Sequence, residues 1–128
     1  MRLLPFAMLA MAALSAPAMS AVPQSFEEAA KTLSKPDYDN FVYCTTTAGA
    51  SWGIMDKLNA GQSPEYLYED VGRIKDDRVR ETLNKTITVA NQLKMHSSGM
   101  LSPDEFSSWN FDRCISTLLP GMKEKKNQ

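Results

Sequence analysis

The chain has little of the chemistry on which most enzymes and metal proteins depend. Its 128 residues include one histidine, His96, and two cysteines, Cys44 and Cys114. A single imidazole excludes a histidine-rich metal site, and the two cysteines form neither a C-x-x-C redox pair nor a C-x-x-C-H haem motif. General acid–base catalysis needs a positioned pair of groups, and no such pair stands out. We therefore expect no enzyme activity, no catalytic residue, no metal site and no cofactor.

Positive and negative charges are nearly balanced. The chain has 14 Lys and Arg against 15 Asp and Glu, a formal net charge of −1. Nucleic acids and anionic membrane surfaces attract proteins that carry a surplus of Lys and Arg. We therefore expect no nucleic-acid partner.

One long apolar run is present, and it lies at the N-terminus. Arg2 precedes an apolar stretch over residues 3–14, and small residues follow at 16–21. This order is typical of a secretory signal peptide, cleaved after Ser20 or Ala21. The run is shorter than the ~20 residues that a membrane-spanning helix needs, so we expect no stable membrane anchor. The alternative is an apolar helix buried in the fold. With the signal removed, the protein would be periplasmic or secreted.

The remaining chain has the length of one domain. Removal of residues 1–21 leaves 107 residues, which suits a single folding unit. We expect a helical domain over residues 22–121 and a charged tail over 122–128.

Signals for the starts and ends of helices punctuate this domain. Capping boxes begin at Ser25 and Ser102, and prolines stand in first-turn positions at 36, 64 and 103. Gly61 and Pro120-Gly121 are stop signals. With apolar residues recurring in steps of three and four, these signals predict helices beginning near residues 26, 36, 64, 77 and 103. The predicted fold is all-α, a small up-and-down bundle of about four to five helices with one disulfide.

The apolar spacing also predicts which helix faces are buried. We expect the buried face of the helix that begins near residue 36 to consist of Phe41, Cys44, Ala48, Trp52, Met55 and Leu58. The corresponding stripe of the last helix is Phe111, Cys114, Ile115 and Leu118.

The two cysteines predict a structural disulfide. Export places the protein in an oxidising compartment, where two distant cysteines on apolar faces favour a bridge. In an up-and-down bundle the helices that carry Cys44 and Cys114 are antiparallel, so both residues fall at the same end. A bridge across about 70 residues contributes roughly 4 kcal/mol in the chain-entropy model.

Two stretches are candidate interaction surfaces. Gly49, Trp52 and Gly53 place two glycines inside a helix, which costs about 1 kcal/mol each relative to alanine. Either another backbone packs closely there, or a partner or ligand docks against a smooth groove beside Trp52. The second stretch consists of Tyr66, Tyr68, Glu69 and Asp70. Its acids, with Asp76, Asp77 and Glu81, form either a solvated face paired with nearby arginines or an acidic contact surface.

The layout resembles a loose class of small two-cysteine, all-helical periplasmic proteins of proteobacteria, many without assigned function. The shared features are the early cysteine, the small residues 45–51, the segment 101–105 and the closing cysteine. Size, predicted export and helix content are also similar to type VI amidase immunity proteins. The acid-stress chaperones of the periplasm likewise share one disulfide and a helical fold.

These observations favour a non-enzymatic exported protein that binds another protein, as an inhibitor, immunity factor or accessory protein. The alternatives are a small-ligand carrier with a pocket near Trp52, and an acid-stress chaperone. The oligomeric state and the identity of the partner stay open.

Overall fold

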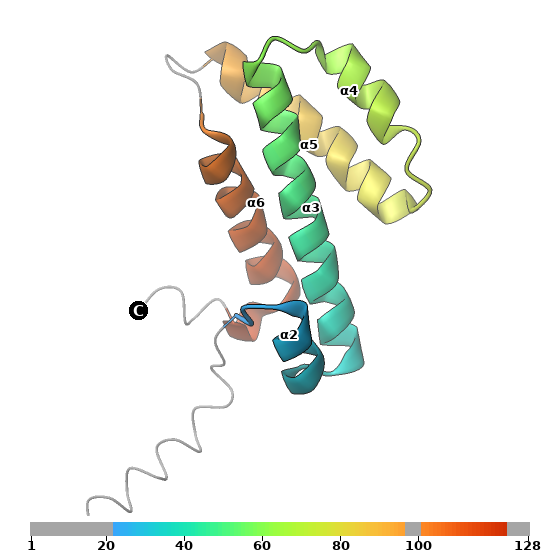
Figure 1. The fold of residues 1–128 in the computed structure, drawn as a ribbon, viewed down its shortest axis with the longest axis vertical. Helices are drawn as coiled ribbons and strands as arrows, with labels where there is room; N and C mark the ends of the chain where they lie inside the picture. The colour runs from blue at the N-terminus through green and yellow to red at the C-terminus, as the bar shows by residue number, and fades with distance from the viewer. Residues whose placement is uncertain (1–21, 97–100, 123–128) are drawn as a thin grey trace, which may run out of the picture.

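The computed structural model describes residues 22–96 and 101–122, which pack as a helical bundle (Figure 1). In chain order the helices are α2 (Phe26–Thr32), α3 (Lys35–Asn59), α4 (Pro64–Val71), α5 (Asp77–His96) and α6 (Pro103–Leu118). The described segments contain no strand, and the all-α prediction is confirmed. None of their helices combines the length and apolar character needed to cross a bilayer. The expected signal peptide and the tail beyond Met122 lie outside the described residues.

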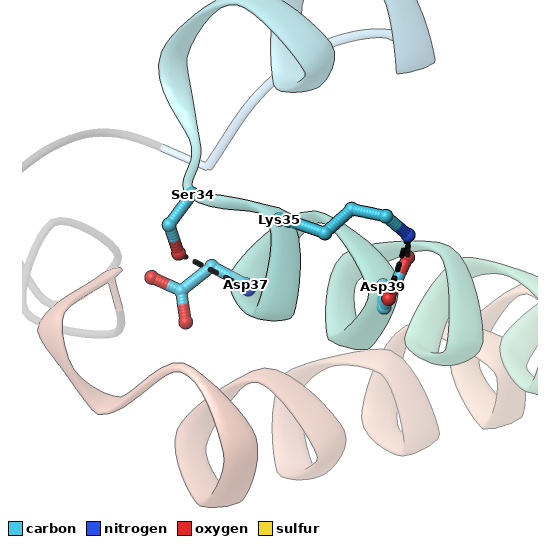
Figure 2. A network of polar contacts seen from close by, with 4 residues as sticks. All are labelled: Ser34, Lys35, Asp37 and Asp39. Atoms are coloured by element: carbon cyan, nitrogen blue, oxygen red, sulfur yellow. Dashed lines mark hydrogen bonds and ion pairs between the residues drawn. The ribbon is translucent and has the colours of Figure 1, made fainter.

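Four helices begin at serine caps that the sequence encodes locally. The hydroxyl oxygens of Ser25, Ser63 and Ser102 each accept a hydrogen bond from the backbone N–H three residues ahead. Figure 2 shows the fourth, where Ser34 Oγ accepts from the Asp37 N–H over 3.3 Å at the start of α3. These bonds satisfy N–H groups that have no partner inside the helix, which is why the helices start where they do.

The end of α3 is a Schellman turn. Gly61 has φ +98°, a conformation that a residue with a side chain rarely adopts. The Gln62 N–H donates to the Lys57 carbonyl over 2.9 Å, and the Gly61 N–H donates to the Leu58 carbonyl over 3.0 Å. This pair of bonds is the signature of the motif and confirms Gly61 as the stop.

The core has two parts, one at each end of α3. At the upper end in Figure 1, α4 covers one side of α3 and α5, and the buried residues are Ile54, Met55, Leu58, Leu67, Val71, Leu83, Ile87, Ala90 and Phe106. At the lower end, α2 and the end of α6 enclose Ala29, Phe41, Cys44, Ile115, Leu119 and Met122. Met122 was expected in the tail, but it is buried against this second cluster.

Trp52 corrects the predicted face of α3. Its side chain is 42% exposed, whereas Ser51 is fully buried. A change of one position rotates a side chain by about 100° around a helix, so the buried stripe passes through Ser51 instead. The prediction was wrong because hydrophobicity favours a buried tryptophan and an exposed serine, and here the two are reversed. On α6, Ile115 is buried, while the other three predicted residues are only partly buried.

Hydrogen bonds to one carbonyl of α3 satisfy the hydroxyl of the buried Ser51 and link α3 to α6. The Ala48 carbonyl oxygen accepts from Ser51 Oγ over 2.7 Å and from Ser107 Oγ, on α6, over 2.8 Å. Both hydroxyls are therefore satisfied inside the interface.

The disulfide prediction is confirmed. Cys44 and Cys114 are bonded, with their Cα atoms 5.5 Å apart and a separation of 70 positions in the sequence. α3 and α6 run in opposite directions side by side (Figure 1), so Cys44 in the first half of α3 lies opposite Cys114 in the second half of α6.

Candidate binding groove

An open groove of about 580 Å³ runs between α5 and α6, with α3 beneath it. Both helices pack on α3, and this arrangement leaves a trough between them on the side away from α4. The lining residues come from three separated segments and are Tyr43, Arg78, Thr82, Lys85, Thr86, Val89, Trp109, Asn110, Arg113, Cys114, Thr117 and Leu118.

Tyr43 ties the floor of the groove to the wall formed by α5. Its hydroxyl is in a short hydrogen bond with Thr82 Oγ1. The guanidinium carbon of Arg78 lies 3.9 Å from the centroid of the Tyr43 ring, within the range of a cation–π contact. The Tyr43 side chain is thus hydrogen-bonded through its hydroxyl and covered on one face of its ring by Arg78.

The wall formed by α6 repeats this pairing of an arginine with an aromatic ring. The guanidinium carbon of Arg113 lies 4.7 Å from the centroid of the Trp109 ring. Trp109 also stacks on the fully buried Phe106, with centroids 6.2 Å apart. The indole is nevertheless 44% exposed, so it is a supported aromatic surface that another molecule can contact.

The groove has charge of one sign. Arg78, Lys85 and Arg113 are exposed, and none of the lining residues within 22–96 and 101–122 carries a carboxylate. The other polar lining groups are threonines, Tyr43 and Asn110, which offer hydrogen bonds without charge. A chain with a formal net charge of −1 therefore has a locally cationic trough, which favours an anionic ligand.

The groove has no catalytic arrangement. It contains no histidine and no carboxylate, and the sulfur of Cys114 is in the disulfide. His96 is exposed at the end of α5 and does not line the groove. Within residues 22–96 and 101–122, no group of three His, Cys, Asp or Glu side chains is placed to hold a metal ion. The lining offers cationic, hydroxyl, amide and aromatic groups to a bound molecule.

The predicted patch at Gly49, Trp52 and Gly53 lies outside this groove. A Cβ added to either glycine would meet no heavy atom within 4 Å, so close approach of another described segment does not explain them. Trp52 Nε1 donates to Asp104 Oδ1 over 2.8 Å. Gly53 instead lines a smaller hollow of about 450 Å³ shared by α3, α4 and α5.

The second predicted patch lies on α4, also outside the groove. Tyr66 and Tyr68 are 49% and 37% exposed, and Glu69 and Asp70 are exposed beside them. Asp70 lies 3.7 Å from Arg73, and further along Asp77 pairs with Arg80. Asp76 accepts from the Val79 N–H over 3.0 Å and caps α5. These local contacts favour the interpretation of the acids as a solvated face.

Sequence reasoning missed the groove, although parts of it carry a detectable signal. Arg78 and Lys85 are seven residues apart, and Trp109 and Arg113 are four apart, so each pair shares one face of a helix. That Tyr43 lies between the two pairs depends on how the three helices pack. No sequence periodicity carries that information.

The fold and the groove define a class: a small disulfide-linked helical domain with a cationic groove. Comparisons with protein-family models, with curated proteins and with solved structures found no match for this chain.

Proposed function

We propose that this chain is an exported, non-enzymatic domain that acts by binding another protein, as an inhibitor, immunity factor or accessory protein. The groove between α5 and α6 is its binding surface. The observation that carries the proposal is the gathering of Arg78, Lys85 and Arg113 around one open trough with no lining carboxylate. Arginine and aromatic residues are enriched at protein interfaces, and this trough has both.

Export is part of the same proposal. The N-terminal pattern is that of a signal peptide, and a disulfide between α3 and α6 suits an oxidising compartment such as the periplasm or the extracellular space. A rigid, covalently tied helical scaffold also holds its surface in one shape, which reduces the entropy lost on binding.

Charge reversal in the groove tests the proposal. Residues 22–128 are immobilised as wild type, as Arg78→Glu/Arg113→Glu, and as the matched control Lys31→Glu/Lys35→Glu. The control makes the same change in charge at two exposed lysines that pair with acids four residues away, Lys31 with Glu27 and Lys35 with Asp39 (Figure 2). Circular dichroism first establishes that all three are folded. Each is then exposed to an envelope extract of the producing cell.

The proposal expects a protein that wild type and control retain and that the groove variant loses. Equal retention by the groove variant would contradict it, as would the absence of any protein retained by wild type. The comparison is decisive because the two variants carry the same change in net charge and differ only in where it lies.

A small-ligand carrier is the second candidate, and the size of the groove favours it. Pockets for small molecules usually measure about 300–1,000 Å³, and this one measures about 580 Å³. The carrier expectation placed the pocket near Trp52, whereas this groove lies beside Trp109. Native mass spectrometry of the purified protein tests the carrier: an anionic small molecule bound to wild type and lost from Arg78→Glu/Arg113→Glu would favour it over the protein-binding function.

A further inference from the structure

We infer that the groove takes an acidic amphipathic α-helix of the partner protein, laid along α5 and α6. The inference rests on the proposed function and names the chemistry of the partner. Helix-in-groove docking is a common mode of recognition in which apolar anchors supply contact area and flanking charges set the register.

The shape of the groove suits a helix. Its α5 wall extends from Arg78 to Val89, which is about 16 Å at a rise of 1.5 Å per residue. Its α6 wall extends from Trp109 to Leu118, about 14 Å. A trough of this length between two helices matches about three turns of a third helix. Such a helix would complete a four-helix arrangement with α3, α5 and α6.

The bundle already contains a precedent for this packing. On the opposite side of α5, α4 inserts Leu67 and Val71 into the core formed with α3. The side between α5 and α6 has no such helix among residues 22–96 and 101–122 (Figure 1). Partly buried apolar groups of Val89 and Leu118 line it, so an apolar stripe on the partner helix would gain contact there.

The positions of the cations define the register. Arg78 and Lys85 are seven residues apart on α5, which is about 10.5 Å along the helix. Two carboxylates seven residues apart on a docked helix have the same separation, so both can face these cations at once. Arg113 on the opposite wall would meet an acid on the other flank, as the charged flanking positions of a coiled coil do.

The C-terminal tail of this chain lacks the acidic residues that the groove would need in its occupant. The last residues include Lys123, Lys125 and Lys126 with a single acid, Glu124. Like charges repel, so this segment lacks the charge complement of Arg78, Lys85 and Arg113. The acid therefore has to come from another molecule.

A designed peptide tests the inference on residues 22–128. The probe is an 18-residue helix-stapled peptide with leucines at its apolar positions, two glutamates seven residues apart on one flank and one glutamate on the other. Two controls carry lysine in place of glutamate, or the same glutamates respaced to five residues apart. The protein carries Trp52→Phe, so that Trp109, in the groove wall, is the sole fluorescence reporter of its two tryptophans.

The inference expects saturable quenching or shift of Trp109 fluorescence by the acidic peptide and none by the lysine peptide. Affinity should fall at least about tenfold for Arg78→Glu/Lys85→Glu and for the respaced peptide, and it should be unchanged in Lys31→Glu/Lys35→Glu. Added salt should weaken binding severalfold, because exposed charges are screened.

Equal binding of the correctly spaced and respaced peptides would overturn the inference. It would mean that the spacing of the glutamates does not have to match that of Arg78 and Lys85. Absence of binding by every acidic peptide would also overturn it. The two proposals fail separately: if the extract partner still depends on Arg78 and Arg113 while no peptide binds, the protein-binding function stands and the helical occupant is wrong. Retention of the partner independent of these arginines would reject the groove itself.

Discussion

Trp52 on α3 donates its indole N–H to the carboxylate of Asp104 in the first turn of α6, over 2.8 Å. The bond joins two residues separated by 52 positions in the chain, and it lies on an exposed surface. Asp104 therefore serves twice, because a carboxylate in the first turn also stabilises the positive end of the helix dipole. The indole N–H of the exposed Trp52 thus has a partner on the neighbouring helix.

The first prediction compares Trp52 with its buried neighbour Met55. Trp52→Phe should lower the free energy of unfolding by only about 1 kcal/mol, since it removes one exposed hydrogen bond. Met55 is fully buried, so Met55→Ala should cost about 2–5 kcal/mol. Urea denaturation followed by circular dichroism measures both. Equal losses would show that Trp52 belongs to the core after all.

The second prediction concerns the glycines inside α3. Gly49→Ala and Gly53→Ala should each raise the free energy of unfolding by about 1 kcal/mol, because alanine is the better helix former and its Cβ meets open space. Gly61→Ala is the contrasting variant. It should destabilise the protein, because φ at Gly61 is +98° and alanine is strained there.

Denaturant midpoints of the three variants decide this point. A loss of stability in Gly49→Ala would reveal a close contact at that surface. A gain in stability combined with loss of the partner would show that the partner approaches the backbone of α3 at this position.

The third prediction concerns the covalent link between α3 and α6. Cys44→Ala/Cys114→Ala should lower the free energy of unfolding by about 4 kcal/mol, because the bridge closes a long loop in the unfolded chain. The comparison is urea denaturation of the variant against the oxidised wild type. Reduced wild type should behave like the variant. If the variant unfolds at the same urea concentration as the oxidised protein, the bridge has no stabilising role.

Cys114 also lines the groove, so the same variant tests more than stability. The lower ends of α3 and α6 are held together by this bridge, and Tyr43 lies next to Cys44 in the floor. The acidic peptide should therefore bind the double-alanine variant more weakly than it binds the oxidised protein under conditions where both are folded.

The fourth prediction concerns the upper end of the bundle. Lys94 Nζ donates to the Leu58 carbonyl over 2.7 Å, and a cation there also complements the negative end of the α3 dipole. Lys94→Met keeps most of the aliphatic stem and removes the charged donor, so it should cost about 1.5–3 kcal/mol. Lys57→Met is the matched control at an exposed lysine of the same helix end, and it should stay within about 0.5 kcal/mol. Similar changes in the free energy of unfolding for both substitutions would mean that the hydrogen bond from Lys94 to the Leu58 carbonyl does not stabilise the fold.

Most of the helix boundaries were predictable because the determinants are local. Ser25, Ser34, Ser63 and Ser102 each act on an N–H three residues away, although Ser34 was not recognised and the start of α3 was placed at Pro36. α4 ends at Val71, and Ile74, beyond the helix end, still packs against the upper core.

The candidate site was much less predictable. The residues chosen from the sequence were conspicuous by type, two glycines, a tryptophan and paired tyrosines, and they lie on surfaces outside the groove. The lysine and arginines that do line it are ordinary members of helices rich in charge. Nothing in their local sequence distinguishes Arg78, which lies over Tyr43, from Arg80, which pairs with Asp77.

The amino-acid sequence by itself determined the helical class, the caps and the two cysteines available for a bridge, because propensity and capping act within a few residues. Only the tertiary structure decided that Ser51 is inside while Trp52 is outside, and that Tyr43, Arg78 and Arg113 face one trough. Those outcomes depend on the relative rotation and separation of α3, α5 and α6. That geometry is set by the packing of many side chains at once, which no short stretch of sequence specifies.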